Sequence, residues 1–195
     1  MVNFIKRFRL IYVRRRYICR QEGFELKTRQ FLEEVMDEHT EYLYRIAYYY
    51  VKDTYKAEDI VQDVFIKFYT SRYEERGELK AYLARMTANA CKDYLKSWAY
   101  RKLKWSETFL KTEQFTDKDR IVEKEELQEL DRAILALPLK KREVIVYYYL
   151  ENMPVKDIAK LLNCPESTIK SRIQSGRSEL KNLLDDEEWE VLTVE

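Results

Sequence analysis

Residues 154–184, PVKDIAKLLNCPESTIKSRIQSGRSELKNLL, contain the pattern that decides the fold of this chain. Apolar residues recur at helical spacing from Val155 to Leu162, and Asn163-Cys164 then interrupts them. Pro165 follows, at a position where a new helix can begin without losing a bonded N–H. The stretch therefore predicts a short helix, a tight turn and a longer second helix.

The predicted second helix has two chemically different faces. Its inward face is apolar or small: Ile169, Ile173, Gly176 and Leu180. Its outward face is polar and cationic: Ser167, Lys170, Ser171, Gln174 and Ser175. This pattern is typical of a helix-turn-helix whose second helix enters the major groove of DNA, where Lys, Ser and Gln can contact base edges. An ordinary pair of helices with a solvated outer face has the same pattern.

The composition predicts a mostly helical protein with an uneven charge distribution. Only three Gly and three Pro occur in 195 residues, enough chain for one large domain or two small ones. Residues 1–30 contain nine Lys or Arg against two Glu, a net charge of +7 within a chain of net +1. Residues 185–195 are acidic. This asymmetry indicates different partners for different segments.

Cysteine and histidine usage argues against a metal site and against catalysis. Cys19, Cys91 and Cys164 are scattered and form no C-x-x-C pair, which favours a reducing, cytoplasmic location. His39 is the only histidine, and we expect it at the surface. With no Gly-rich phosphate loop and no apolar run of 18 residues, we expect no enzyme activity, cofactor, small-molecule substrate or membrane span.

The remaining chain predicts five more helices and a linker. The helices are expected over residues 29–51, 55–72, 79–102, 123–136 and 140–150. Residues 106–122 are polar and lack a clean period, so we interpret them as a linker between two helical domains. Residues 1–28 are basic with an aromatic stripe. They fit an amphipathic helix on a membrane surface or on nucleic acid, a solvated extension, or translated sequence upstream of the true start.

Two of these helices carry charged surfaces. In 55–72, Asp59, Gln62 and Asp63 share an outward stripe, which suits solvent or a basic partner helix. In 79–102, the far half is basic and is interleaved with aromatic residues. Aromatic rings beside cations suit unstacked bases and phosphates, although core aromatics with lysines reaching to solvent give the same pattern.

Four segments together resemble the bacterial extracytoplasmic-function sigma factors of the sigma-70 family. They are AEDIVQDVF (57–65), AYLARMTANACKDYL (81–95), LPLKKREV (137–144) and STIKSR (167–172). Each is weak alone, but their order and spacing extend over most of the chain. The resemblance implies an all-α fold of two small domains. Residues 29–105 would form a region 2-like domain and 123–184 a region 4-like helix-turn-helix domain, with 1–28 as an extension and 185–195 as an acidic tail.

The resemblance also implies roles for individual residues. Asp59, Gln62 and Asp63 match the motif that docks on core RNA polymerase. Asn89 matches a position that holds a flipped base of the −10 element, and Lys92, Lys96, Arg101 and Lys102 lie where the family grips melting DNA. The −35 element would be read by the second helix of the helix-turn-helix: Ser167, Thr168, Lys170, Ser171, Arg172 and Gln174.

Two departures from the family pattern bear on these roles. The usual region 2 tryptophan is Tyr82, and Ser175-Gly176-Arg177 replaces a more basic run in the second helix. The expected function is promoter recognition for core RNA polymerase, with promoter DNA and an anti-sigma factor as further partners. The alternative is a stand-alone helix-turn-helix regulator that never melts DNA. The acidic stripe and the basic aromatic helix speak against that alternative, because a repressor needs neither.

Overall fold

The first group of helices forms a three-helix unit. The computed structural model describes residues 29–71, 78–108, 129–184 and 189. Its first helices are α2 (Arg29–Val51), α3 (Thr54–Thr70) and α4 (Leu79–Thr108). Lys52 takes a left-handed conformation with φ of 57°, and the Asp53 side chain then caps α3 by accepting from the Lys56 N–H at 2.8 Å. This tight connection makes α2 and α3 neighbours.

The second group contains the predicted helix-turn-helix. Its elements are α6 (Glu129–Ala136), α7 (Leu139–Ile145), the π-helical turn η2 (Val146–Leu150), α8 (Val155–Leu162) and α9 (Glu166–Lys181). Asn163 adopts the left-handed conformation with φ of 52° and ends α8, and α9 starts directly after Pro165. The predicted turn is therefore confirmed, and Asn suits it because its side chain tolerates this conformation.

Gly176 shows why α9 packs so closely on α7. A Cβ atom at this position would lie 2.9 Å from Cγ1 of Ile145, which is fully buried. The glycine costs helix propensity, as expected from the sequence, but it allows the two helix backbones to approach. The predicted inward face is otherwise confirmed, since Ile169 and Leu180 are buried.

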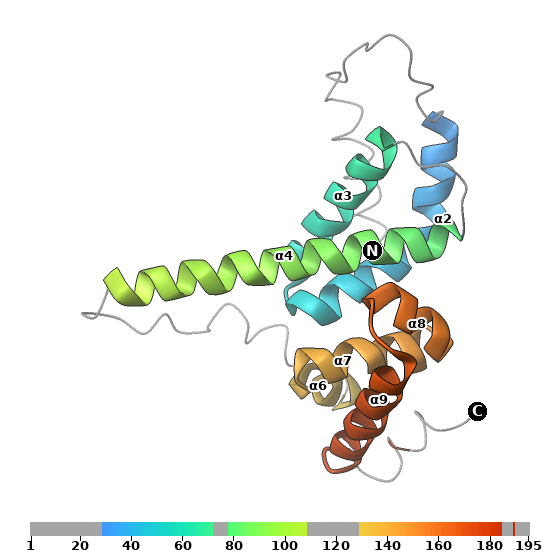
Figure 1. The fold of residues 1–195 in the computed structure, drawn as a ribbon. Helices are drawn as coiled ribbons and strands as arrows, with labels where there is room; N and C mark the ends of the chain where they lie inside the picture. The colour runs from blue at the N-terminus through green and yellow to red at the C-terminus, as the bar shows by residue number, and fades with distance from the viewer. Residues whose placement is uncertain (1–28, 72–77, 109–128, 185–188, 190–195) are drawn as a thin grey trace.

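The two groups pack against each other and share one hydrophobic core. The same buried cluster contains Leu43 and Phe65 from the first group together with Tyr147, Ile158 and Ile169 from the second. Figure 1 shows α7 and α8 beside the body formed by α2 and α4. We call the contact between α2–α4 and α6–α9 the seam. Within the described residues no helix is long and apolar enough to cross a membrane.

Two sequence predictions need correction. The helix expected to end near residue 102 extends to Thr108, so its last turn occupies the start of the predicted linker. Figure 1 shows this far end of α4 extending beyond the packed helices. His39 is buried rather than at the surface, with 6% of its area exposed, and burial lowers its pKa. The predicted segments 1–28, 109–122 and 123–128, and all of the acidic tail except Trp189, lie outside the described residues.

Candidate nucleic-acid interface

The outward face of α9 carries most of the residues that the sequence assigned to the −35 element. Four are exposed and one is half-buried: Ser167, Lys170, Ser171 and Gln174, with Thr168 less open. The Ser171 hydroxyl donates to the Thr168 carbonyl at 3.0 Å and keeps its lone pairs available as acceptors. The first N–H groups of α9 lack intrahelical acceptors, as at every helix start, and can donate to phosphate.

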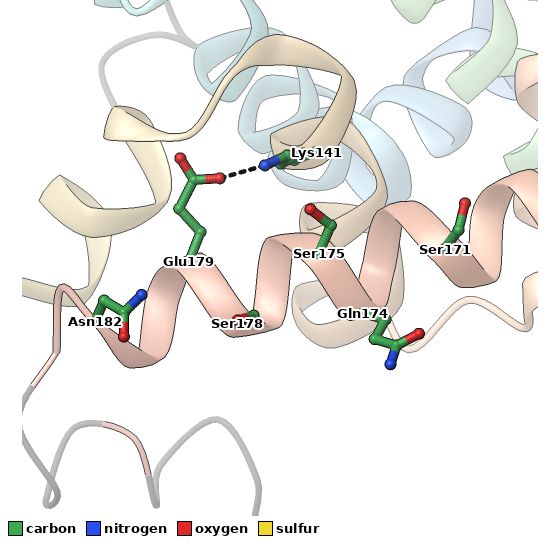
Figure 2. A pocket seen from close by; sticks show the side chains of 7 residues that line it. All are labelled: Lys141, Ser171, Gln174, Ser175, Ser178, Glu179 and Asn182. Atoms are coloured by element: carbon green, nitrogen blue, oxygen red, sulfur yellow. Dashed lines mark hydrogen bonds and ion pairs between the residues drawn. The ribbon is translucent and has the colours of Figure 1, made fainter.

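A shallow polar hollow of about 400 Å³ lies beside this face, between α9 and α7. It is lined by Lys141, Ser171, Gln174, Ser175, Ser178, Glu179 and Asn182. Figure 2 shows an ion pair between Lys141 and Glu179 beside the hollow, with 2.6 Å between Nζ and Oε2. Gln174 extends away from α7. The ion pair connects α7 to α9 and helps to fix the orientation of the polar face.

Arg172 lies apart from the other predicted −35 residues. Its side chain is only 21% exposed, and Nη1 lies 3.4 Å from Oε1 of the buried Glu143. Lys170, two residues earlier, is exposed, and no carboxylate among the described residues pairs with it. Among the described residues, the predicted set therefore divides into Lys170, which has no carboxylate partner, and Arg172, which is paired with Glu143.

The predicted −10 residues on α4 divide in the same way. Asn89 is exposed, and Lys96 is 79% exposed with only a long contact of 3.8 Å to Asp93. Lys92 instead points into the seam, where its Nζ lies 3.1 Å from Oε2 of Glu143. The side chains of Arg101 and Lys102 lie outside the described part of α4. Asn89 and Lys96 are thus the members of this set that the structure presents to solvent.

The acidic stripe on α3 is exposed as its spacing predicted. Asp59 and Asp63 are open to solvent and Gln62 is half-buried, while the opposite face of α3 is buried in the core. Ile66 continues the same stripe and is 41% exposed, a feature that the sequence analysis missed. Its spacing of three from Asp63 was the available signal. The stripe therefore combines two carboxylates with an exposed aliphatic side chain.

Glu143 is the charged residue that sequence reasoning overlooked. Its side chain is 5% exposed, and it accepts from the Tyr50 hydroxyl at 2.7 Å in addition to its contacts with Lys92 and Arg172. Burial is the main cause that raises the Tyr50 pKa, so the phenol is the donor. These partners are 29 to 93 residues away in sequence, so no local spacing could have revealed the cluster.

The cysteines and acidic residues give no support for a metal or covalent site. Burial raises the pKa of the Cys91 thiol to about 12, so it stays protonated and is a poor nucleophile. In the described parts of the chain, no group of His, Cys, Asp and Glu could hold a metal ion. The exposed groups on α3, α4 and α9 can instead bind partners through ionic contacts and hydrogen bonds.

Comparisons with known proteins identify both halves of the chain. Residues 35–101 match Sigma-70 region 2, and residues 127–180 match Sigma-70, region 4. The ECF RNA polymerase sigma factor SigW of Bacillus subtilis is 26% identical over 165 residues, which cover 78% of this chain and 88% of SigW. The ECF sigma factor SigM of Mycobacterium tuberculosis is 26% identical over 160 residues, covering 80% of this chain and 78% of SigM.

The fold is also similar to a solved sigma factor. RpoE of Bartonella quintana, solved in complex with the anti-sigma factor NepR, superposes with a TM-score of 0.64. The match covers 80% of this chain and 97% of RpoE at 24% sequence identity. At this identity the likeness establishes the common all-helical arrangement of the two regions.

Proposed function

The chain belongs to the extracytoplasmic-function class of sigma-70 factors, which direct core RNA polymerase to promoters, and from this membership we propose a role for each exposed surface. The stripe on α3 docks on core polymerase, the solvent face of α4 engages the −10 element, and the outward face of α9 reads the −35 element. The observation that carries the proposal is the presence of all three surfaces, in family order, on one chain.

Core polymerase binding is assigned to Asp59, Gln62 and Asp63. Their side chains lie on one face of α3 and are held by a helix whose other face is buried. Among the described residues, Asp59 pairs with Lys56 of its own helix, at 3.4 Å, and a basic partner can displace that exposed contact at little cost. We propose that Ile66 adds an apolar contact at the end of the same surface.

Recognition of the −10 element is assigned to α4. Asn89 is exposed on the same helix as Lys92 and Lys96, and an amide can hydrogen-bond the edge of an extruded base. The lysines and, further along α4, Arg101 and Lys102 would contact the phosphates of the opened strand. Figure 1 shows the far end of α4 extending beyond the packed helices, and this projection supports the role.

Recognition of the −35 element is assigned to α9. Lys170 is exposed and has no carboxylate partner among the described residues, so it can contact a phosphate, and Ser171 and Gln174 can donate to or accept from base edges. Ser167 and Thr168 lie in the first turn of α9, where hydroxyls and main-chain N–H groups commonly contact the DNA backbone. Arg172 joins this surface only if it leaves Glu143.

The domain limits and remaining partners are also proposals. We assign residues 29–108 to the region 2-like domain, with the linker now beginning after Thr108, and residues 123–184 to the region 4-like domain. We propose that an anti-sigma factor controls the protein, as the RpoE–NepR complex suggests by analogy. A promoter-binding role also implies a non-enzymatic protein that works in the cytoplasm, where the DNA is.

Transcription in vitro tests the function without knowledge of the promoter. Core polymerase, the purified protein and fragmented genomic DNA of the source organism are incubated with nucleotides, and the 5′ ends of the transcripts are sequenced. We expect a small set of discrete start sites that depend on the protein. DNA binding without any new start site would instead favour the stand-alone regulator.

A further inference from the structure

Glu143 connects both regions of the molecule through one buried carboxylate. It lies on α7, and it meets Tyr50 on α2, Lys92 on α4 and Arg172 on α9. Tyr50 and Lys92 belong to the region 2-like half, whereas Arg172 belongs to the region 4-like half. The two cations are residues that the family match places on DNA. One carboxylate is therefore shared by a cation from each of the two DNA-binding surfaces.

A second buried carboxylate reinforces the seam. The Glu151 side chain is 3% exposed, and its Oε1 lies 2.8 Å from Nε of Arg45 on α2. Tyr49 donates to Asp131 across the same boundary, and Arg85 donates to the Lys160 carbonyl at 3.0 Å. These contacts are specific and directional, and they hold the two regions in one relative orientation.

The seam also contains a group that is poorly satisfied. Arg142 is 6% exposed, and its Nε and Nη1 atoms have no hydrogen-bond partner. Burial lowers its pKa to about 10, so it is still charged at neutral pH. A buried cation with unsatisfied N–H groups is costly, and this cost makes the closed arrangement less favourable. The seam thus contains both ion pairs that favour the closed arrangement and a poorly satisfied arginine that disfavours it.

We propose that Glu143 is an autoinhibitory latch: it withholds Lys92 from DNA while the two regions are closed on each other, and it also engages Arg172 within the region 4-like half. A DNA phosphate competes with the carboxylate for Lys92, so engagement of promoter DNA by Lys92 favours opening and opening favours that engagement. Arg172 becomes available when a phosphate displaces Glu143 within the region 4-like half. The latch rests on the proposed assignment of these two cations to DNA. In the closed state, the free protein binds DNA only through its exposed cations, such as Lys170 and Lys96.

The variant that releases the latch is Glu143→Gln. It keeps an acceptor for the Tyr50 hydroxyl but removes the charge that holds Lys92 and Arg172. Glu129→Gln is the matched control, because Glu129 is exposed on α6 and its ionic contact within the described residues is with Arg132 of its own helix, at 3.7 Å. Both variants remove one negative charge, so any general electrostatic effect on DNA binding appears in both.

Spin-label distances in the free protein report whether the seam is closed. Labels at Thr70→Cys on α3 and Lys181→Cys on α9, both exposed positions, are measured after Cys19 and Cys164 are replaced by Ser. We expect one narrow distance distribution for the parent protein and for Glu129→Gln. Glu143→Gln should give a broad distribution that extends to longer distances. A broad distance distribution in the parent protein would overturn the latch. A distribution for Glu143→Gln that equals that of the parent would overturn it as well.

DNA binding gives the second readout, with a mixed-sequence 30-base-pair duplex as the probe. In Glu143→Gln, Lys92 and Arg172 can each contact a phosphate. The slope of the logarithm of DNA affinity against the logarithm of salt concentration should therefore steepen by about 1.8, about 0.9 for each contact. Affinity at low salt should rise about tenfold, as expected when roughly a tenth of the parent molecules are open. A change below twofold, or one equal to that of Glu129→Gln, overturns the proposal.

A second variant guards against misfolding of Glu143→Gln. Arg45→Met breaks the other ion pair of the seam without touching Glu143 or a proposed DNA contact, and it should also broaden the spin-label distances. If it does not, the latch is wrong. Transcription by the parent protein is measured separately, so loss of start sites overturns the proposed function, whereas unchanged distances overturn only the latch.

Discussion

The carboxylates of α3 and those of the seam are the same chemical group in opposite environments. Asp59 and Asp63 are exposed, and their charges are available to another protein. Glu143 and Glu151 are buried, and their charges are already committed to cations from the other half of the molecule. Exposed charges contribute little to stability and stay available for recognition, whereas a buried charge that loses its partner is strongly destabilising. In this protein the exposed carboxylates lie on α3, and the buried ones lie on α7 and at the end of η2.

The largest effect should come from reversing the exposed charges. Replacing both Asp59 and Asp63 by Lys should weaken binding to core polymerase at least about 100-fold, or 2.8 kcal/mol, because the docking stripe then repels a basic partner. The free energy of unfolding should change by less than about 0.5 kcal/mol, as at other surface sites. Co-purification with core enzyme measures the first quantity, and circular dichroism during urea unfolding measures the second. Undiminished co-purification would remove α3 from the docking site.

A smaller effect, on stability instead of binding, is expected at the seam. Arg45→Met leaves the buried Glu151 without its cation and should lower the free energy of unfolding by about 2 kcal/mol, somewhat less than for a fully buried pair because Arg45 is 42% exposed. Glu41→Gln is the control, since it removes only the exposed partner of the same arginine. Its effect should stay within about 0.5 kcal/mol. Equal losses in the two variants would mean that burial does not distinguish the carboxylates.

The sequence predicted the elements well because their signals are local. Apolar periodicity located α2, α3 and α9, and Asn163 with Pro165 located the turn between α8 and α9. The outward positions of Asp59 and Asp63 followed from the same period. The same period also placed His39 on the buried face, four residues after Val35 and four before Leu43, but the usual exposure of a polar side chain argued against burial.

Charges that act between distant segments were beyond the reach of sequence patterns. Lys92 and Arg172 sit at spacings that suit DNA contacts, yet Glu143 holds both of them in the folded chain. Nothing in the sequence around residue 143 indicates which cations will meet it, since one comes from α4 across the seam and the other from α9. Only the tertiary structure divides the predicted DNA-binding cations into free and paired groups.

Asn89→Ala should have an effect of intermediate size that is confined to strand opening. Asn89 is exposed and lies outside the latch, so its loss should not alter the seam or duplex binding by α9. Loss of one hydrogen-bonded base contact should reduce open-complex formation about tenfold, or 1.4 kcal/mol. Permanganate footprinting of the promoter bubble, with closed-complex affinity measured alongside, separates the two steps. Normal opening would assign Asn89 a structural role instead.

The smallest effect is the most direct comparison of a free cation with a paired one. Lys170 is exposed without a carboxylate partner among the described residues, so Lys170→Ala should reduce the salt slope of duplex binding by about 0.9, the value of one phosphate contact. Arg172→Ala in the same free protein should change the slope by much less, because Glu143 already neutralises that guanidinium.

The comparison becomes decisive when Glu143→Gln is added to each variant. With the latch released, Arg172 should behave like Lys170, and Arg172→Ala should then lower the slope by about 0.9. Lys170→Ala should have the same effect in both backgrounds, because it does not interact with Glu143. The four combinations of Arg172→Ala and Glu143→Gln form a double-mutant cycle whose coupling measures the pair itself. Additive slopes in that cycle would show that Arg172 is equally available with or without Glu143. The distinction between free and paired cations would then have no consequence for DNA binding.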